Sequence, residues 1–189
     1  MRKWIAVALF VVAAATGSYF WRWGYRLTPL SALAVRLDGD VEILRTTPVY
    51  GGLALLVQRE QSGCFVAVVR RAGPFWVSMG FAQCGAVTDA PVTKAGMGCD
   101  MEPGPTFKPV AAYGGIFSDP RVTTVRAEGQ ADQSVTPETG YLFVYEDEVY
   151  IQPMQAFAED GTLLYVLHEG TMWEWMPAQT SLLPEPVTQ

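Results

Sequence analysis

Histidine is almost absent from this sequence: the 189 residues include only His168. A single histidine excludes metal sites built from several histidines and mechanisms that use a pair of imidazoles. A Ser-His-Asp triad would have to use His168, which we expect at the end of a strand, and no G-x-S-x-G motif accompanies it. The chain also lacks a C-x-x-C pair and a nucleotide-binding glycine loop. The sequence therefore predicts no catalytic residue, no metal site and no cofactor.

Charged residues are also scarce, at 17% of the chain, whereas 50% of the residues are hydrophobic. The net charge is −6, but residues 1–26 hold four basic and no acidic side chains, so the rest of the chain carries −10. A body this acidic binds phosphate groups poorly, which argues against nucleic acid and anionic lipid as partners. The charge mainly favours solubility.

An apolar run without a single charge covers residues 4–20, between Arg2-Lys3 and a second pair of basic residues, Arg22 and Arg26. Basic residues, an apolar run and interfacial aromatic residues together are typical of a transmembrane helix. We therefore expect residues 1–26 to form a transmembrane anchor with an aromatic-basic collar. The aromatic members of this collar are Tyr19, Phe20, Trp21, Trp23 and Tyr25.

Two other interpretations of this segment stay open. A cleaved signal peptide would use Ala13-Ala14-Ala15 as its processing site, and a core helix would bury the same apolar residues inside the fold. The anchor is favoured because the apolar run and the collar continue past the alanines. The short N-terminal tail favours a cytoplasmic N-terminus. This predicts a single-pass protein of the cell membrane with an extracytoplasmic body.

The rest of the sequence predicts a mainly β (α+β) fold with two small antiparallel β-rich units. In residues 27–88, Thr28-Pro29 is typical of a helix N-cap followed by proline, so we expect one short helix just outside the membrane. Short apolar runs between glycine, proline and polar turns then predict an antiparallel meander. Its strands are expected at residues 41–47, 53–59, 64–71 and 75–83.

Residues 89–109 contain three glycines and four prolines without hydrophobic periodicity, which predicts a linker or a long loop. Residues 110–176 predict the second β unit, in which Asp160-Gly161 indicates a hairpin with a type I′ turn. Residues 177–189 contain three prolines and predict a flexible tail. The strands of the second unit are expected at residues 110–113, 122–127, 141–145, 149–157 and 162–168.

Three stretches of turn and strand residues carry a resemblance to known sequences. They are residues 114–122 (GGIFSDPRV), residues 154–164 (MQAFAEDGTLL), and residues 47–53 (TPVYGGL) with the Phe75-Trp76 strand that follows. Together they resemble a loose group of uncharacterised, membrane-anchored or exported bacterial β-rich proteins, over most of residues 45–167. The acidic residue of the second stretch, Asp160, stands one place later than is usual in the group. The resemblance implies export and a β-rich architecture and transfers no catalytic site.

Aromatic residues are the candidates for a binding surface. Trp173 and Trp175 are two residues apart, so on a strand they share a face, and Trp76 and Tyr113 add further rings. Exposed rings stack on sugars or anchor protein interfaces. In a small β protein, however, aromatic side chains mostly fill the core, so both interpretations stay open.

Three cysteines remain, and in an external body they can be oxidised. With a turn at Gly73-Pro74, cross-strand partners sum to about 147, so Cys64 faces residue 83, one place from Cys84. A Cys64–Cys84 disulfide therefore needs a β-bulge or a turn one residue longer. Cys99 is the competing partner for either cysteine, and three free thiols are the third alternative.

Two acidic stretches, residues 146–148 and 99–102, have the carboxylates that hard cations prefer. Neither has the spacing of a calcium-binding EF-hand loop. We expect the first to be a solvated hairpin tip and the second to be part of the Gly/Pro-rich segment.

These observations favour a membrane-anchored extracytoplasmic binding or assembly module over an enzyme. Besides the membrane, the expected partner is another envelope protein or a glycan. The alternative is a cell-wall or glycan-directed hydrolase. The hydrolase requires two facing carboxylates in a cleft, whereas the module requires an accessible apolar or aromatic patch.

Overall fold

The computed structural model describes residues 2–37, 40–59, 63–84, 93–101, 108–147, 153–168 and 174–178. Trp173, Glu148, the Asp38-Gly39 pair and the tail from residue 179 onward lie outside these ranges. The elements, in chain order, are α1 (Arg2–Arg22), α2 (Pro29–Ala34), β1 (Val41–Val49), β2 (Gly52–Arg59), β3 (Gly63–Ala72), β4 (Phe75–Gln83), β5 (Ala95–Asp100), β6 (Pro109–Gly115), β7 (Thr124–Ala127), β8 (Gln133–Ser134), β9 (Tyr141–Glu146), β10 (Met154–Phe157), β11 (Leu163–His168) and β12 (Glu174–Pro177).

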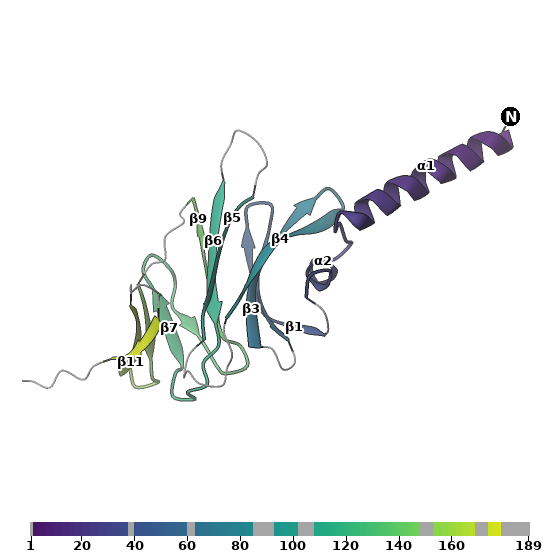
Figure 1. Ribbon diagram of the computed structural model, residues 1–189. Helices are drawn as coiled ribbons and strands as arrows, with labels where there is room; N and C mark the ends of the chain where they lie inside the picture. The colour runs from purple at the N-terminus through teal and green to yellow at the C-terminus, as the bar shows by residue number, and fades with distance from the viewer. Residues whose placement is uncertain are drawn as a thin grey trace, which may run out of the picture.

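The N-terminal helix α1 stands away from the body (Figure 1). Its segment Lys3–Arg22 is apolar and long enough to cross a membrane, and none of it is buried. A signal sequence at the N-terminus would have the same properties. Apart from Phe20 at its C-terminal end, which stacks on Phe75, the apolar side chains of α1 are exposed, which contradicts the core-helix interpretation.

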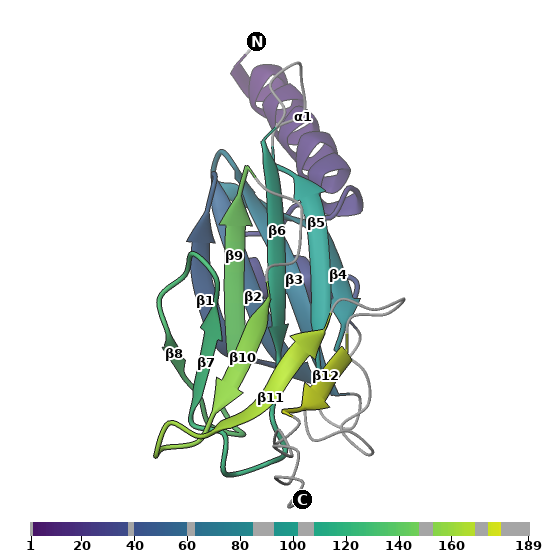
Figure 2. The same ribbon diagram turned by 90° about the vertical axis from the view of Figure 1, so that its left-hand side faces the viewer.

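The mainly β prediction is confirmed: antiparallel strands form three sheets that lie one behind the other (Figure 2). The proximal sheet has the order β1-β2-β3-β4, the middle sheet β5-β6-β9, and the outer sheet β12-β11-β10-β7-β8. The short helix α2 covers the free face of the proximal sheet (Figure 1). The body is thus a stack of four layers, with α2 and α1 on one side and the outer sheet on the other.

Three hydrophobic clusters hold the layers together. The first packs Leu33 of α2 and Leu37, which follows the helix, against Leu55 and Val57 of β2. The second joins the proximal and middle sheets, and the third joins the middle and outer sheets. Strands β2, β3 and β6 are therefore buried on both faces, which explains why they have continuous apolar runs rather than alternation.

Local sequence signals account for the first unit. Thr28 is the N-cap of α2, its side chain accepting a hydrogen bond from the Ser31 amide, and Pro29 is the first helical residue, as expected. The strands β1 to β4 agree with the expected ranges within two residues, and β4 agrees at both ends.

The expected linker at residues 89–109 is wrong for its centre, because residues 95–100 form β5 and pair with β6 along its length. Gly96 and Gly98 have no side chains with which to show an alternating pattern, so the sequence concealed this strand. A Cβ at Gly96 would lie 2.6 Å from the ring of Tyr113, so the glycine is needed for that ring to pack there. The short strands β8 and β12 were also not expected.

The predicted hairpin between β10 and β11 exists, but its turn is not of type I′. Gly161 has a φ of +83°, whereas Asp160 has no positive φ, and the Gly161 amide donates to the Ala158 carbonyl at 3.0 Å. The loop is therefore a β-turn followed by a left-handed glycine, which accompanies a register shift between Ala156 and Phe157. The sequence predicts a two-residue loop at Asp160-Gly161, whereas the loop in the structure is one residue longer.

Asp119 connects the loop after β6 to the outer sheet. Its carboxylate accepts hydrogen bonds from the Arg121 guanidinium (2.7 Å) and from the Tyr165 hydroxyl (2.7 Å), and the side chain is 9% exposed. The hydrogen bonds from Arg121, followed by that from Tyr165, hold the pKa of Asp119 well below its usual range. The carboxylate is thus stabilised in its charged form in the folded state.

We predict that Asp119 contributes to stability above its unfolded pKa of about 3.9 and that this contribution is lost as the pH falls further. The free energy of unfolding in urea, measured from neutral to acid pH, should fall less for Asp119→Asn than for the unmodified chain. Asp132→Asn is the matched control, because Asp132 also pairs with an arginine but its side chain is 45% exposed. Equal pH profiles for Asp119→Asn and the unmodified chain would contradict the assignment.

We also predict that Gly161→Val destabilises the protein by about 1–3 kcal/mol. A Cβ at Gly161 would meet nothing within 4 Å, so the cost is that of the positive φ alone. Gly161→Asn should be milder, because asparagine tolerates this backbone conformation. Thermal unfolding of the two variants provides the comparison, and equal losses would show that φ is not the cause.

Candidate functional site

A cavity of about 440 Å³ lies between the middle and outer sheets, next to the C-terminal end of β4. Its volume is within the range of small-ligand pockets. One wall is formed by residues 94–98, which comprise Lys94 and the first four residues of β5. The remaining lining residues are Ala82, Gln83, Tyr113, Tyr141, Met154 and Leu167.

The cavity is next to a sheet edge. Among the described residues, β5 pairs with β6 on one side and with no strand on the other. Beyond this open edge, the neighbouring strand β4 is likewise the last of the proximal sheet. Backbone N–H and C=O groups at such an edge can pair with an added strand.

The polar groups of the cavity are few and come from different elements. Lys94 supplies the only cationic side chain of the lining, and no carboxylate or histidine is among the lining residues that the structure describes. Burial raises the pKa of both Tyr113 and Tyr141, so their hydroxyl groups remain protonated at neutral pH. The described lining can bind an apolar group and orient it by hydrogen bonds.

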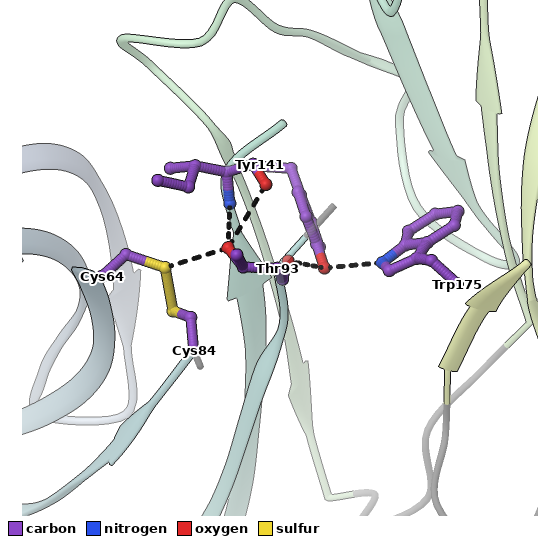
Figure 3. The surroundings of a disulfide bond; sticks show 6 residues. Cys64, Cys84, Thr93, Tyr141 and Trp175 are labelled. Atoms are coloured by element: carbon purple, nitrogen blue, oxygen red, sulfur yellow. Dashed lines mark hydrogen bonds between the residues drawn. A yellow bond between two sulfur atoms is a disulfide. The ribbon is translucent and has the colours of Figure 1, made fainter. Parts of the chain in front are cut away.

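Tyr141 joins the cavity wall to a buried network, shown in Figure 3. Its hydroxyl donates to the Thr93 carbonyl at 3.4 Å and accepts from Trp175 Nε1 at 3.1 Å. Thr93 Oγ1 in turn accepts from the Ile116 amide at 3.1 Å and lies 3.5 Å from Cys64 Sγ. The network therefore runs from the proximal sheet through the middle sheet to β12 and fixes the ring of Tyr141.

Cys64 and Cys84 form a disulfide at the proximal-sheet end of this network, with their Cα atoms 5.2 Å apart (Figure 3). The sequence favoured this pairing but required one extra residue in the hairpin. The structure provides it: Val68 pairs with Gly80 and Val69 with Ser78, so Met79 is a β-bulge. The shift brings Cys84 opposite Cys64, and the Cys84 amide donates to the Cys64 carbonyl at 2.8 Å.

The three aromatic candidates that the structure describes do not come together in one surface. Tyr113 lines the cavity. Trp175 packs edge-to-face against Phe117 and Tyr141, and it is partly buried against the core. Trp76 packs against the cluster beneath α2, and Trp173 lies outside the described residues. Of the three candidates that the structure describes, only Tyr113 lines the cavity.

The acidic residues at the end of β9 form hydrogen bonds with Tyr50. Glu146 accepts a hydrogen bond from the Tyr50 amide at 2.8 Å, and Asp147 accepts one from the Tyr50 hydroxyl at 2.6 Å. The latter hydrogen bond, more than burial, raises the pKa of Tyr50 to about 12. Within the described part of the chain, no three His, Cys, Asp or Glu side chains gather closely enough to hold a metal ion.

Sequence reasoning missed most of the cavity lining. Gln83, Met154 and Leu167 stand at strand ends or within apolar runs, and nothing in their local pattern distinguishes them from core residues. The closest sequence signal was the Gly96-Met97-Gly98 repeat, which lowers the bulk along one strand edge. It was interpreted as a loop instead.

The disulfide generates a prediction for the purified full-length chain. Peptide mapping without reductant should recover Cys64 linked to Cys84 and an alkylatable Cys99, which the structure shows as a free thiol. The double variant Cys64→Ala, Cys84→Ala should lose about 3 kcal/mol of unfolding free energy, as expected for a loop of 20 residues. Cys99→Ser is the control and should lose less. Alkylation of all three thiols in the protein from its native compartment would refute the pairing.

The chain was compared with known proteins by sequence and by structure. No family model, no curated protein and no solved structure matches it.

Proposed function

We propose that this chain is a membrane-anchored, extracytoplasmic binding module that takes up an extended apolar segment of another envelope protein at the open edge of β5. The observation that carries the proposal is the cavity of about 440 Å³ beside an edge strand that has no second partner among the described residues. The N-terminal helix α1 supplies the anchor.

The chemistry of this edge suits an added strand. Peptides that extend a sheet bind through main-chain hydrogen bonds, and pockets for alternate side chains provide selectivity. Gly96 and Gly98 present little side-chain bulk along β5, so a second backbone can approach closely. Apolar residues such as Met154 and Leu167 then line the space into which one side chain of the added segment would project.

The C-terminal end of α1 and the residues that follow it pack on the body. Phe20 of α1 stacks on Phe75 at the start of β4, with ring centroids 5.4 Å apart, and Tyr25 packs edge-on against the same ring. Arg26 forms a backbone bridge with Trp76 through two hydrogen bonds of 2.9 and 2.7 Å. A signal peptide cleaved after Ala15 would leave Phe20 on the mature chain, so this contact is compatible with both interpretations. In a membrane anchor, the contact holds the body in place at the end of α1.

Site-specific photocrosslinking in native membranes tests the proposal. A benzoylphenylalanine at Gln83, an exposed position at the cavity, should give a discrete adduct that is sensitive to protease. The same probe at Thr46, which is exposed on the opposite edge strand of the proximal sheet, is the matched control and should not give it. The variant Ala82→Leu, which narrows the cavity, should reduce the yield at Gln83.

Three results would contradict the proposal. An adduct that appears equally at both positions would indicate non-specific proximity. A protease-resistant adduct that glycosidases remove would indicate a glycan ligand instead of a protein segment. An unchanged yield in Ala82→Leu would place the contact outside the cavity.

A further inference from the structure

The side of the body that carries α2 has an unpartnered apolar and basic surface. Three apolar side chains of the segment that follows α1 are exposed: Leu27 by 74%, Leu30 by 38% and Val35 by 46%. They flank Ala32 and Leu33, which α2 buries against the proximal sheet. We call this set, together with exposed Arg36, the α2 surface.

Helix α2 lies on the same side of the body from which α1 leaves (Figure 1). The contacts of Phe20 and Arg26 with the β3–β4 turn connect α1 to the body through a short, packed connection rather than a long loose linker. Where α1 enters a bilayer, that connection keeps the α2 surface close to the headgroups. The outer sheet is then the layer farthest from the membrane.

Charge is distributed along the same axis. Residues 1–94 contain ten basic and five acidic side chains, whereas residues 95–189 contain three basic and fourteen acidic ones. Among residues 1–37 no acidic side chain occurs, and Arg71 adds an exposed basic group at the β3–β4 turn. Asp40 and Glu42 lie at the end of the proximal sheet opposite the β3–β4 turn, where Val41 pairs with Arg59, and Asp40 follows Arg36 by four residues. The acidity that argues against anionic lipid as a partner therefore belongs mainly to residues 95–189, whereas residues 1–94 carry a net positive charge, most of it in residues 1–26.

We propose that the α2 surface binds the bilayer into which α1 inserts, with Leu27, Leu30 and Val35 at the boundary of headgroups and acyl chains and with Arg36 and Arg71 at anionic headgroups. Exposed apolar residues beside basic ones are the pattern of helices that lie in the membrane interface. The contact fixes the tilt of the body, so that the edge of β5 is held at a constant height above the membrane. This inference depends on the anchor of the proposed function.

Spin labels on the full-length chain distinguish insertion of the α1 anchor from the contact of the α2 surface with the bilayer. In a Cys99→Ser background that keeps the disulfide, single labels are placed at Leu9→Cys in α1, Val35→Cys after α2 and Met176→Cys in β12. The chain is reconstituted in nanodiscs of phosphatidylcholine, or of an equal mixture of phosphatidylcholine and phosphatidylglycerol. Collision with oxygen reports lipid exposure, and collision with a water-soluble nickel chelate reports solvent exposure.

We expect Leu9→Cys in the acyl region, Met176→Cys in water, and Val35→Cys at the interface, more deeply in the discs that contain phosphatidylglycerol. Arg36→Gln and Arg71→Gln should each lower the equilibrium constant for this contact about fivefold in those discs. Arg126→Gln removes the same charge from the outer sheet and should have no effect.

If Leu9→Cys is in the bilayer while Val35→Cys is as water-exposed as Met176→Cys, the inference is overturned and the anchor stands. If Leu9→Cys is itself water-exposed, the anchor fails and the inference fails with it. If the depth of the Val35→Cys label changes neither with phosphatidylglycerol nor with the arginine variants, the role of the anionic headgroups is overturned.

Discussion

The burial of the middle sheet on both of its faces is the constraint on which the rest of the body depends. All seven residues of β6 are buried, and the strand supplies side chains to two hydrophobic clusters at once. Val110 and Ala112 pack toward the proximal sheet, whereas Ala111 and Tyr113 pack toward the outer sheet. Neither of the flanking sheets can keep its inner face dry without β6, so the two expected β units are packed on each other and share their cores.

This stacking also produces the cavity. Alanine at positions 111 and 112 and glycine at 114 and 115 keep β6 narrow, and the backbone of neighbouring segments approaches it closely. A Cβ at Gly115 would overlap the Thr93 carbonyl, so the glycine permits the segment before β5 to pass there. The large ring of Tyr113 then projects toward the outer sheet and leaves space beside β5. The space results from mismatched side-chain sizes in adjacent layers.

The disulfide, the bulge and the Tyr141 network act on the same corner of the stack. The bulge at Met79 aligns Cys84 with Cys64, and the resulting disulfide holds the end of β4 beside Thr93. Thr93 then positions Tyr141, which Trp175 contacts from the outer sheet. The wall of the cavity is therefore attached to all three sheets. A binding site that has such a rigid wall loses less conformational entropy when a ligand binds.

The sequence by itself determined the features that depend on neighbours along the chain. The cap at Thr28, the strands β1 to β4 and the positive φ of Gly161 follow from patterns a few residues long, and the apolar helix α1 follows from one continuous run. It also limited the disulfide to a register that differed by one residue from the observed one. The tertiary structure alone decided the bulge at Met79, because a bulge depends on how two strands twist together against a third layer.

The tertiary structure also decided the roles of the candidate residues. Trp76, Tyr113 and Trp175 look alike in sequence, yet the first packs beneath α2, the second lines the cavity and the third joins the outer sheet to Tyr141. Strand β5 was hidden because glycine shows no periodicity, and its identity depends on pairing with β6. Periodicity reports which side of a strand is apolar, whereas the layer that will cover that side is set by contacts between residues far apart in the chain.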